Sequence, residues 1–106
     1  MIHFGFLQQR SVDIFCNPKP RMVYEFKNIP FTGEVKVSDY TRALFENGEL
    51  VKIHNTKGTI LLRLQKPSDW STCLMVNGVL VGIDQAIKVG ILSKEKLLYY
   101  KLKGDL

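Results

Sequence analysis

The sequence predicts an α+β fold: a small, mainly antiparallel sheet of roughly five to eight short strands, with one central helix and one or two C-terminal helices. Short apolar runs rich in β-branched and aromatic residues alternate with turn residues, which is typical of strands. Residues 47–53 also return in similar form as residues 77–83. Each copy opens on Asn-Gly, the strongest short turn signal, so both predict a strand entered through a tight reversal.

The length and composition predict one globular domain spanning residues 1–106. The chain of 106 residues can bury a sizeable core without a disulfide or metal, and its 45% hydrophobic and 24% charged content is typical of globular proteins. No apolar run approaches the ~20 residues needed to cross a bilayer, and the first residues lack the features of a signal peptide. We therefore expect a cytoplasmic protein with reduced cysteines and no membrane partner.

The first third of the chain predicts extended structure. Residues 2–7 and 11–16 are apolar and aromatic, and the two prolines in 17–20 must interrupt regular structure after them. Residues 21–27 alternate between apolar and polar side chains, which predicts a half-buried strand. Residues 32–37 predict another extended segment.

A central helix is predicted to follow. Ser38 or Asp39 is suited to the N-cap position of such a helix. The helix would turn Tyr40 and Leu44 toward the core, and Gly48 suits the position after its last turn.

Residues 50–54 and 59–65 predict a hairpin. The turn residues between them favour a three-residue loop, whereas polarity favours a two-residue loop that leaves Lys52, His54 and Arg63 on a wet face. We prefer the second register, because a slip of one residue would bury Lys52 and His54 among leucines.

Residues 73–76 and 79–83 predict a second hairpin, joined by a type I′ turn. Neither strand carries a charged residue, so both faces must be covered, by helices or by a second subunit. We expect self-association through this segment, most simply as a symmetric dimer. The predicted interface residues are Cys73, Met75, Val79 and Val81.

Two helices are predicted at the C-terminal end. Asp84 can cap a short helix over residues 85–89, and Ser93 can cap a second over residues 94–102. The second segment also fits a terminal strand because of its aromatic residues, and we favour the helix.

The net charge of +5 and the pI near 9.3 favour an anionic partner. Basic residues of the first predicted hairpin, with a tryptophan close behind, resemble the surfaces that contact phosphates and stack bases. The ordinary alternative is a solvated hairpin face and a tryptophan packed over the edge of the core. The predicted ligand-binding residues are Lys52, His54, Lys57, Arg63, Lys66 and Trp70.

No residue pattern predicts catalysis, a metal site or a cofactor. The histidines and cysteines are scattered singly, and neither a glycine-rich phosphate loop nor a paired-carboxylate pattern is identifiable. We therefore predict a small non-catalytic binding or regulatory protein that recognises a nucleotide-like ligand or nucleic acid through the basic hairpin face. The alternative is a protein-interaction module or inhibitor that acts through residues 73–83, and an enzyme ranks third.

Overall fold

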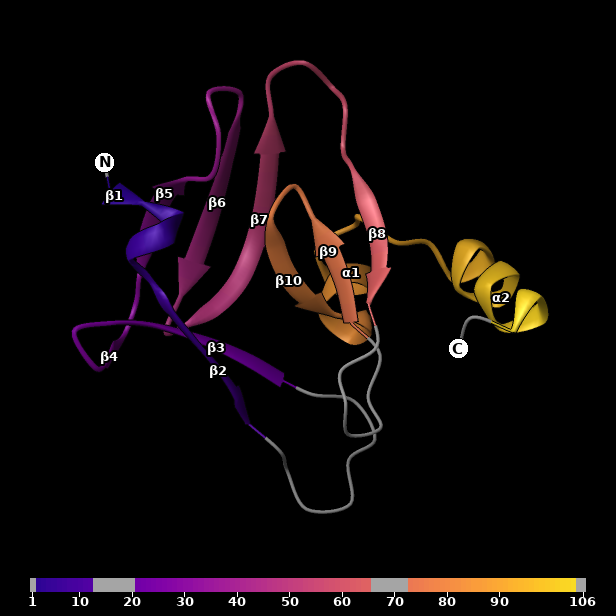
Figure 1. The fold of residues 1–106 in the computed structure, drawn as a ribbon, viewed down its shortest axis with the longest axis horizontal. Coiled ribbons are helices and arrows are strands. Elements are labelled where there is room, and N and C mark those ends of the chain that lie inside the picture. The colour runs from indigo at the N-terminus through magenta and orange to yellow at the C-terminus, as the bar shows by residue number, and fades with distance from the viewer. Residues whose placement is uncertain (1, 13–20, 66–72, 105–106) are drawn as a thin grey trace.

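The structure is a computed structural model that describes residues 2–12, 21–65 and 73–104. These residues form ten short strands in three sheets, two α-helices and one 3₁₀ turn (Figure 1). The first sheet has the order β1-β5-β6-β7: Ile2–His3, Gly33–Lys36, Thr41–Glu46 and Glu49–Asn55. The second has the order β2-β3-β4: Gln8–Val12, Arg21–Phe26 and Ile29–Pro30. The third has the order β10-β9-β8: Val79–Gly82, Cys73–Val76 and Leu62–Gln65.

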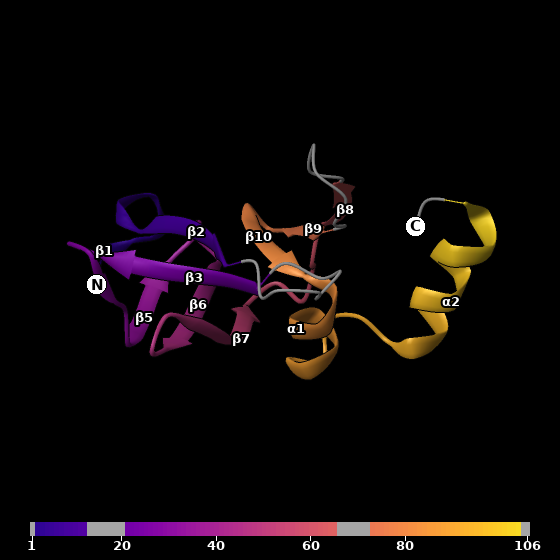
Figure 2. The ribbon, with the colours of Figure 1, turned by 90° about the horizontal axis from the view of Figure 1, so that it is seen from below.

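The α+β class and the mainly antiparallel pairing are confirmed, since β1 with β5 is the one parallel pair among the described strands. The expected single sheet is instead three small ones. Strands β2 and β3 lie over one face of the four-stranded sheet, and helix α1 (Ile83–Lys88) lies beside the β9–β10 hairpin (Figure 2).

An aromatic cluster fills the space between the first two sheets. The ring of Tyr24 lies 4.7 Å from that of Phe45 and 5.6 Å from that of Phe4, which belongs to the 3₁₀ turn η1 (Phe4–Phe6). The buried side chains of all three sheets and of α1 form one continuous hydrophobic cluster. The core therefore holds the sheets together at their inner faces and leaves the outer face of the first sheet to solvent.

Both copies of the repeat form the predicted tight reversals. Asn47 and Gly48 have φ of 50° and 82°, and Asn77 and Gly78 have φ of 47° and 89°, as a type I′ turn requires at both central residues. Each turn joins two antiparallel strands, β6 to β7 and β9 to β10. The predicted strand entries and the second hairpin are confirmed.

The predicted central helix is wrong, because residues 41–46 form strand β6. Thr41, Ala43 and Phe45 are buried and the residues between them are exposed, which is the two-residue period of a strand. Leu44 and Tyr40 consequently face outward rather than into the core. The type I′ turn that follows requires an extended strand on each side, so the same Asn-Gly that suggested a helix end excludes a helix here.

The first predicted hairpin is also wrong in its pairing. Residues 55–58 do form a turn, in which the Gly58 N–H donates to the Asn55 carbonyl at 3.2 Å, but β7 pairs with β6, and β8 pairs with β9. A bulge in β7 leaves Val51 without an opposite residue in β6, so Leu50 and Ile53 both face the core. Lys52 and His54 stay exposed as predicted.

At the N-terminal end, the expected strand over residues 2–7 is divided into β1 and η1. Gln8–Arg10, expected to connect two strands, lies within β2, which pairs with β3. The alternating strand over residues 21–27 is confirmed as β3. Residues 13–20, with Cys16 and the predicted proline break, lie outside the described residues.

The helical choice for the C-terminal segment is confirmed. Helix α2 (Lys94–Lys103) starts at Ser93, whose hydroxyl accepts a hydrogen bond from the Lys96 N–H at 3.1 Å. Helix α1 starts one turn position earlier than predicted, with Gly82 at its N-cap and Asp84 in its first turn. In both views α2 extends away from the sheets, and none of its residues is buried (Figures 1 and 2).

Cys73 should be unreactive in the folded protein. The residue is free and has no exposed surface, and burial raises the pKa of its thiol. In a Cys16→Ser variant, we expect iodoacetamide at neutral pH to label Cys73 only after addition of denaturant, because the thiolate is the nucleophile and the folded state disfavours it. Mass spectrometry that showed complete labelling of the native protein within minutes would contradict the burial.

Candidate functional site

The outer face of the four-stranded sheet carries a row of basic residues. His3 lies opposite Lys36, Lys36 opposite Arg42, and Arg42 opposite His54, so the row crosses β1, β5, β6 and β7 in turn. All four side chains are exposed. Because neighbouring strands lie about 4.8 Å apart, the four residues span about 14 Å. We call His3, Lys36, Arg42 and His54 the basic row.

The strand pattern of the sequence holds the basic row outside. Val35, Ala43 and Ile53 form the adjacent row across the same strands, and all three are buried. Successive side chains of a strand point to opposite faces, so burial of these three residues turns their basic neighbours to solvent. No described helix or strand lies on the opposite side of β5 and β6 from β2 and β3 (Figure 2).

Two carboxylates pair with members of the basic row. Glu34 Oε1 lies 3.4 Å from Arg42 Nη1, and Asp39 Oδ1 lies 3.4 Å from Lys36 Nζ. These pairs are solvent-exposed, and exposed ion pairs contribute about 1 kcal/mol or less. They hold the cations in place at low cost and can be exchanged for contacts to an anionic ligand.

Lys52 adds a further cation to this face, opposite Leu44 and two residues before His54 in β7. Among the described residues neither Lys52 nor His54 has an ion-pair partner. An anion on this face would therefore meet positive charge that is not already neutralised.

An exposed aromatic residue lies at one end of the face. Tyr40 is 48% exposed, and Lys57 Nζ lies 4.0 Å from the centre of its ring. The Thr56 N–H donates to the Tyr40 carbonyl at 2.9 Å, which fixes the two turns to each other. Lys57, predicted as a ligand-binding residue, thus lies beside the basic row as part of a cation–π pair.

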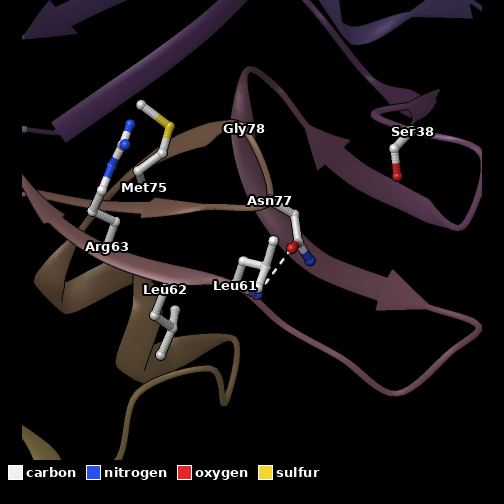
Figure 3. Close-up of a pocket in the computed structure, with 7 residues that line it drawn as sticks. All are labelled: Ser38, Leu61, Leu62, Arg63, Met75, Asn77 and Gly78. Carbon is white, nitrogen blue, oxygen red and sulfur yellow. Dashed lines mark hydrogen bonds between the residues drawn. The ribbon is translucent and has the colours of Figure 1, made fainter.

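The other predicted binding residues do not join this face. Arg63 belongs to β8 in the third sheet, where it lines a separate hollow of about 720 Å³ (Figure 3). Lys66 and Trp70 lie outside the described residues. The structure therefore brings together Lys52, His54 and Lys57 of the predicted set.

The sequence reasoning missed the remaining members of the basic row. Arg42 was assigned to a helix, and His3 and Lys36 are far from Lys52 in sequence. The alternation of Arg42 between Thr41 and Ala43 was the signal that could have placed it on an exposed strand face.

The predicted interface residues lie mostly inside the chain. Cys73, Val79 and Val81 have no exposed surface, and Met75 is half-buried. The described chain thus buries most of this hairpin by itself, and self-association through residues 73–83 stays a prediction.

Metal and membrane features were also examined within the described ranges. No three His, Cys, Asp or Glu side chains there are grouped as a metal site would require. None of the described helices is long and apolar enough to cross a membrane.

Comparisons with known proteins add no relative. No protein-family model, no curated protein and no solved structure matches this chain.

Proposed function

We propose that the protein is a non-catalytic binding protein that recognises single-stranded nucleic acid through the basic row. The observation that carries the proposal is the register that aligns four exposed basic side chains across four strands. Lysine and arginine side chains that contact phosphates release counterions from the nucleic acid, which supplies much of the affinity of such complexes.

The shape of the face favours a polymer over a single nucleotide. The basic row lies on an open sheet surface about 14 Å across, whereas a mononucleotide is usually held in a concave pocket that buries most of it. Tyr40 at one end offers an exposed ring, and proteins that bind single strands combine a basic surface with aromatic side chains on which bases stack. A flexible single strand can follow the row and place a base against Tyr40.

The proposal predicts a loss of affinity on removal of two charges from the basic row. In a Lys36→Gln, Arg42→Gln double variant, binding of a fluorescein-labelled single-stranded oligonucleotide should weaken by about tenfold or more at low salt. The slope of log affinity against log salt should also fall by about 2, since each lost phosphate contact removes about one unit. Fluorescence anisotropy measures both quantities.

A matched control uses the same charge loss elsewhere. Lys94 and Lys96 lie exposed on α2, so a Lys94→Gln, Lys96→Gln variant should bind within about twofold of the unmodified protein. All four substitutions are on the surface and should change stability by about 0.5 kcal/mol or less. Equal losses in the two variants would show that only net charge matters, and an absence of binding by the unmodified protein at low salt would refute the proposal.

A further inference from the structure

The hollow that contains Arg63 has the composition of a small-ligand site. Its lining combines an apolar floor with three polar side chains from separate segments (Figure 3). Its volume of about 720 Å³ lies within the usual range of about 300–1,000 Å³ for ligand pockets. The lining residues are Ser38, Leu61, Leu62, Arg63, Met75, Asn77 and Gly78.

The pairing of β8 with β9 gathers the key residues of this hollow on one face. Arg63 lies directly opposite Met75 in the two strands. Leu61 and Asn77 each lie two residues further along, and two-residue spacing keeps a side chain on the same face of a sheet. Diagonal neighbours about 7–8 Å apart remain within reach of a long side chain. The Arg63 guanidinium and the Asn77 amide can therefore contact one ligand.

Asn77 presents a hydrogen-bond donor without a partner. Its Oδ1 accepts from the Leu61 N–H at 2.9 Å, and its own N–H donates to the Leu61 carbonyl at 3.0 Å. These two bonds fix the amide, and its Nδ2 is buried without a hydrogen-bond partner in the described part of the chain. A buried donor of this kind is unfavourable unless it finds an acceptor, so the site favours a ligand with an oxygen at this position.

Arg63 supplies the charge for such an oxygen. Its side chain is exposed, and no carboxylate among the described residues forms an ion pair with it. The planar guanidinium matches the two oxygens of a carboxylate better than a single point charge would. Ser38, on the other side of the hollow, has a hydroxyl that can donate a further hydrogen bond.

We propose that this hollow binds a small carboxylate with an apolar body. The carboxylate oxygens accept hydrogen bonds from the Arg63 guanidinium and from Asn77 Nδ2, and the apolar body covers Leu61 and Met75. Leu61 is 69% exposed, so a ligand here would also remove a large apolar side chain from water. None of the residues of the basic row lines this hollow, so the site is independent of the proposed nucleic-acid function.

Decanoate is a suitable probe, with decanol as the uncharged probe of the same chain length. In ¹H–¹⁵N NMR spectra of the folded protein, decanoate should shift the side-chain amide signals of Asn77 and the Nε–H signal of Arg63. Decanol should bind at least about tenfold more weakly, because it cannot form the charged hydrogen bonds. Absence of a shift at the Asn77 amide, or equal affinity for the two probes, would overturn the proposal.

A pair of Arg→Gln variants provides the matched control. Arg63→Gln should weaken decanoate binding by about tenfold or more and change decanol binding by less than about twofold. Arg42→Gln, which removes the same group from the basic row, should leave decanoate binding unchanged. Equal effects of the two substitutions would show that decanoate responds to overall charge and would contradict a site at Arg63.

Discussion

Replacing Gly48 with alanine should lower the free energy of unfolding by about 2–5 kcal/mol. Gly48 has a φ of +82°, which costs an L-residue about 1–2 kcal/mol. A Cβ atom there would also lie 2.8 Å from Val23 Cγ1 and 3.1 Å from the Tyr24 carbonyl oxygen. Relief of this overlap would disturb the contact of β3 with the turn, where the Tyr24 N–H donates to the Gly48 carbonyl at 2.8 Å. Urea unfolding measures the loss.

The repeat itself provides the control for this prediction. Gly78 has the same place in the second Asn-Gly turn and a similar φ of +89°, but the nearest atom to its added Cβ would be Val37 Cγ1 at 3.7 Å. Gly78→Ala should therefore cost only the backbone strain, about 1–2 kcal/mol. Equal losses at the two glycines would show that the packing of the first turn against β3 is not as the structure describes.

Replacing Tyr24 with alanine should cost about 3–5 kcal/mol, the usual range for deletion of a large buried aromatic side chain. Tyr24 is fully buried between Phe4 and Phe45, and its hydroxyl donates a hydrogen bond to the Leu80 carbonyl. It therefore joins β3 in the second sheet to β10 at the edge of the third. Tyr24→Phe keeps the ring and loses only this hydrogen bond, so it should cost about 1–2 kcal/mol.

The same pair of proteins should differ in alkaline solution. Burial raises the pKa of the Tyr24 hydroxyl above its ordinary value of about 10, with the nearby Cys73 as a smaller cause. The folded state then keeps the proton while the unfolded state loses it, so this contribution to stability is present below pH 10 and is lost as the pH rises further. Tyr24→Phe should show a shallower decline above pH 10, and an identical decline in both proteins would contradict this assignment.

Local signals in the sequence predicted the local structure well. The two Asn-Gly pairs were interpreted as tight reversals and form type I′ turns, because few other residues adopt positive φ at both positions. The alternation in residues 21–27 and the Ser93 cap likewise determine structure within a few residues of themselves. Such features depend little on the rest of the chain.

Pairing between strands was not predictable in the same way. Residues 41–46 carry both a plausible N-cap before them and an alternating pattern, and the helix interpretation overlooked the second signal. Assignment of β7 to a hairpin with β8 followed from their closeness in sequence, whereas each pairs across an Asn-Gly turn or with the apolar β9. The choice among partners depends on the whole core.

The candidate site shows the same division. Exposure of Lys52 and His54 could be predicted from polarity along one strand. The row they share with His3, Lys36 and Arg42 exists only through the register of four strands, one of which had been assigned as helix. The hollow at Arg63 depends on the β8–β9 pairing, which was not foreseen either.

The most direct test of the proposed function is a ¹H–¹⁵N NMR titration of the protein with a single-stranded oligonucleotide at low salt. We expect the largest backbone shifts at Lys36, Arg42 and His54, with smaller ones at Tyr40. Signals of α2, which carries exposed lysines but lies away from the four-stranded sheet, should remain unchanged. Shifts centred on α2, or spread evenly over the lysines of the molecule, would contradict recognition through the basic row.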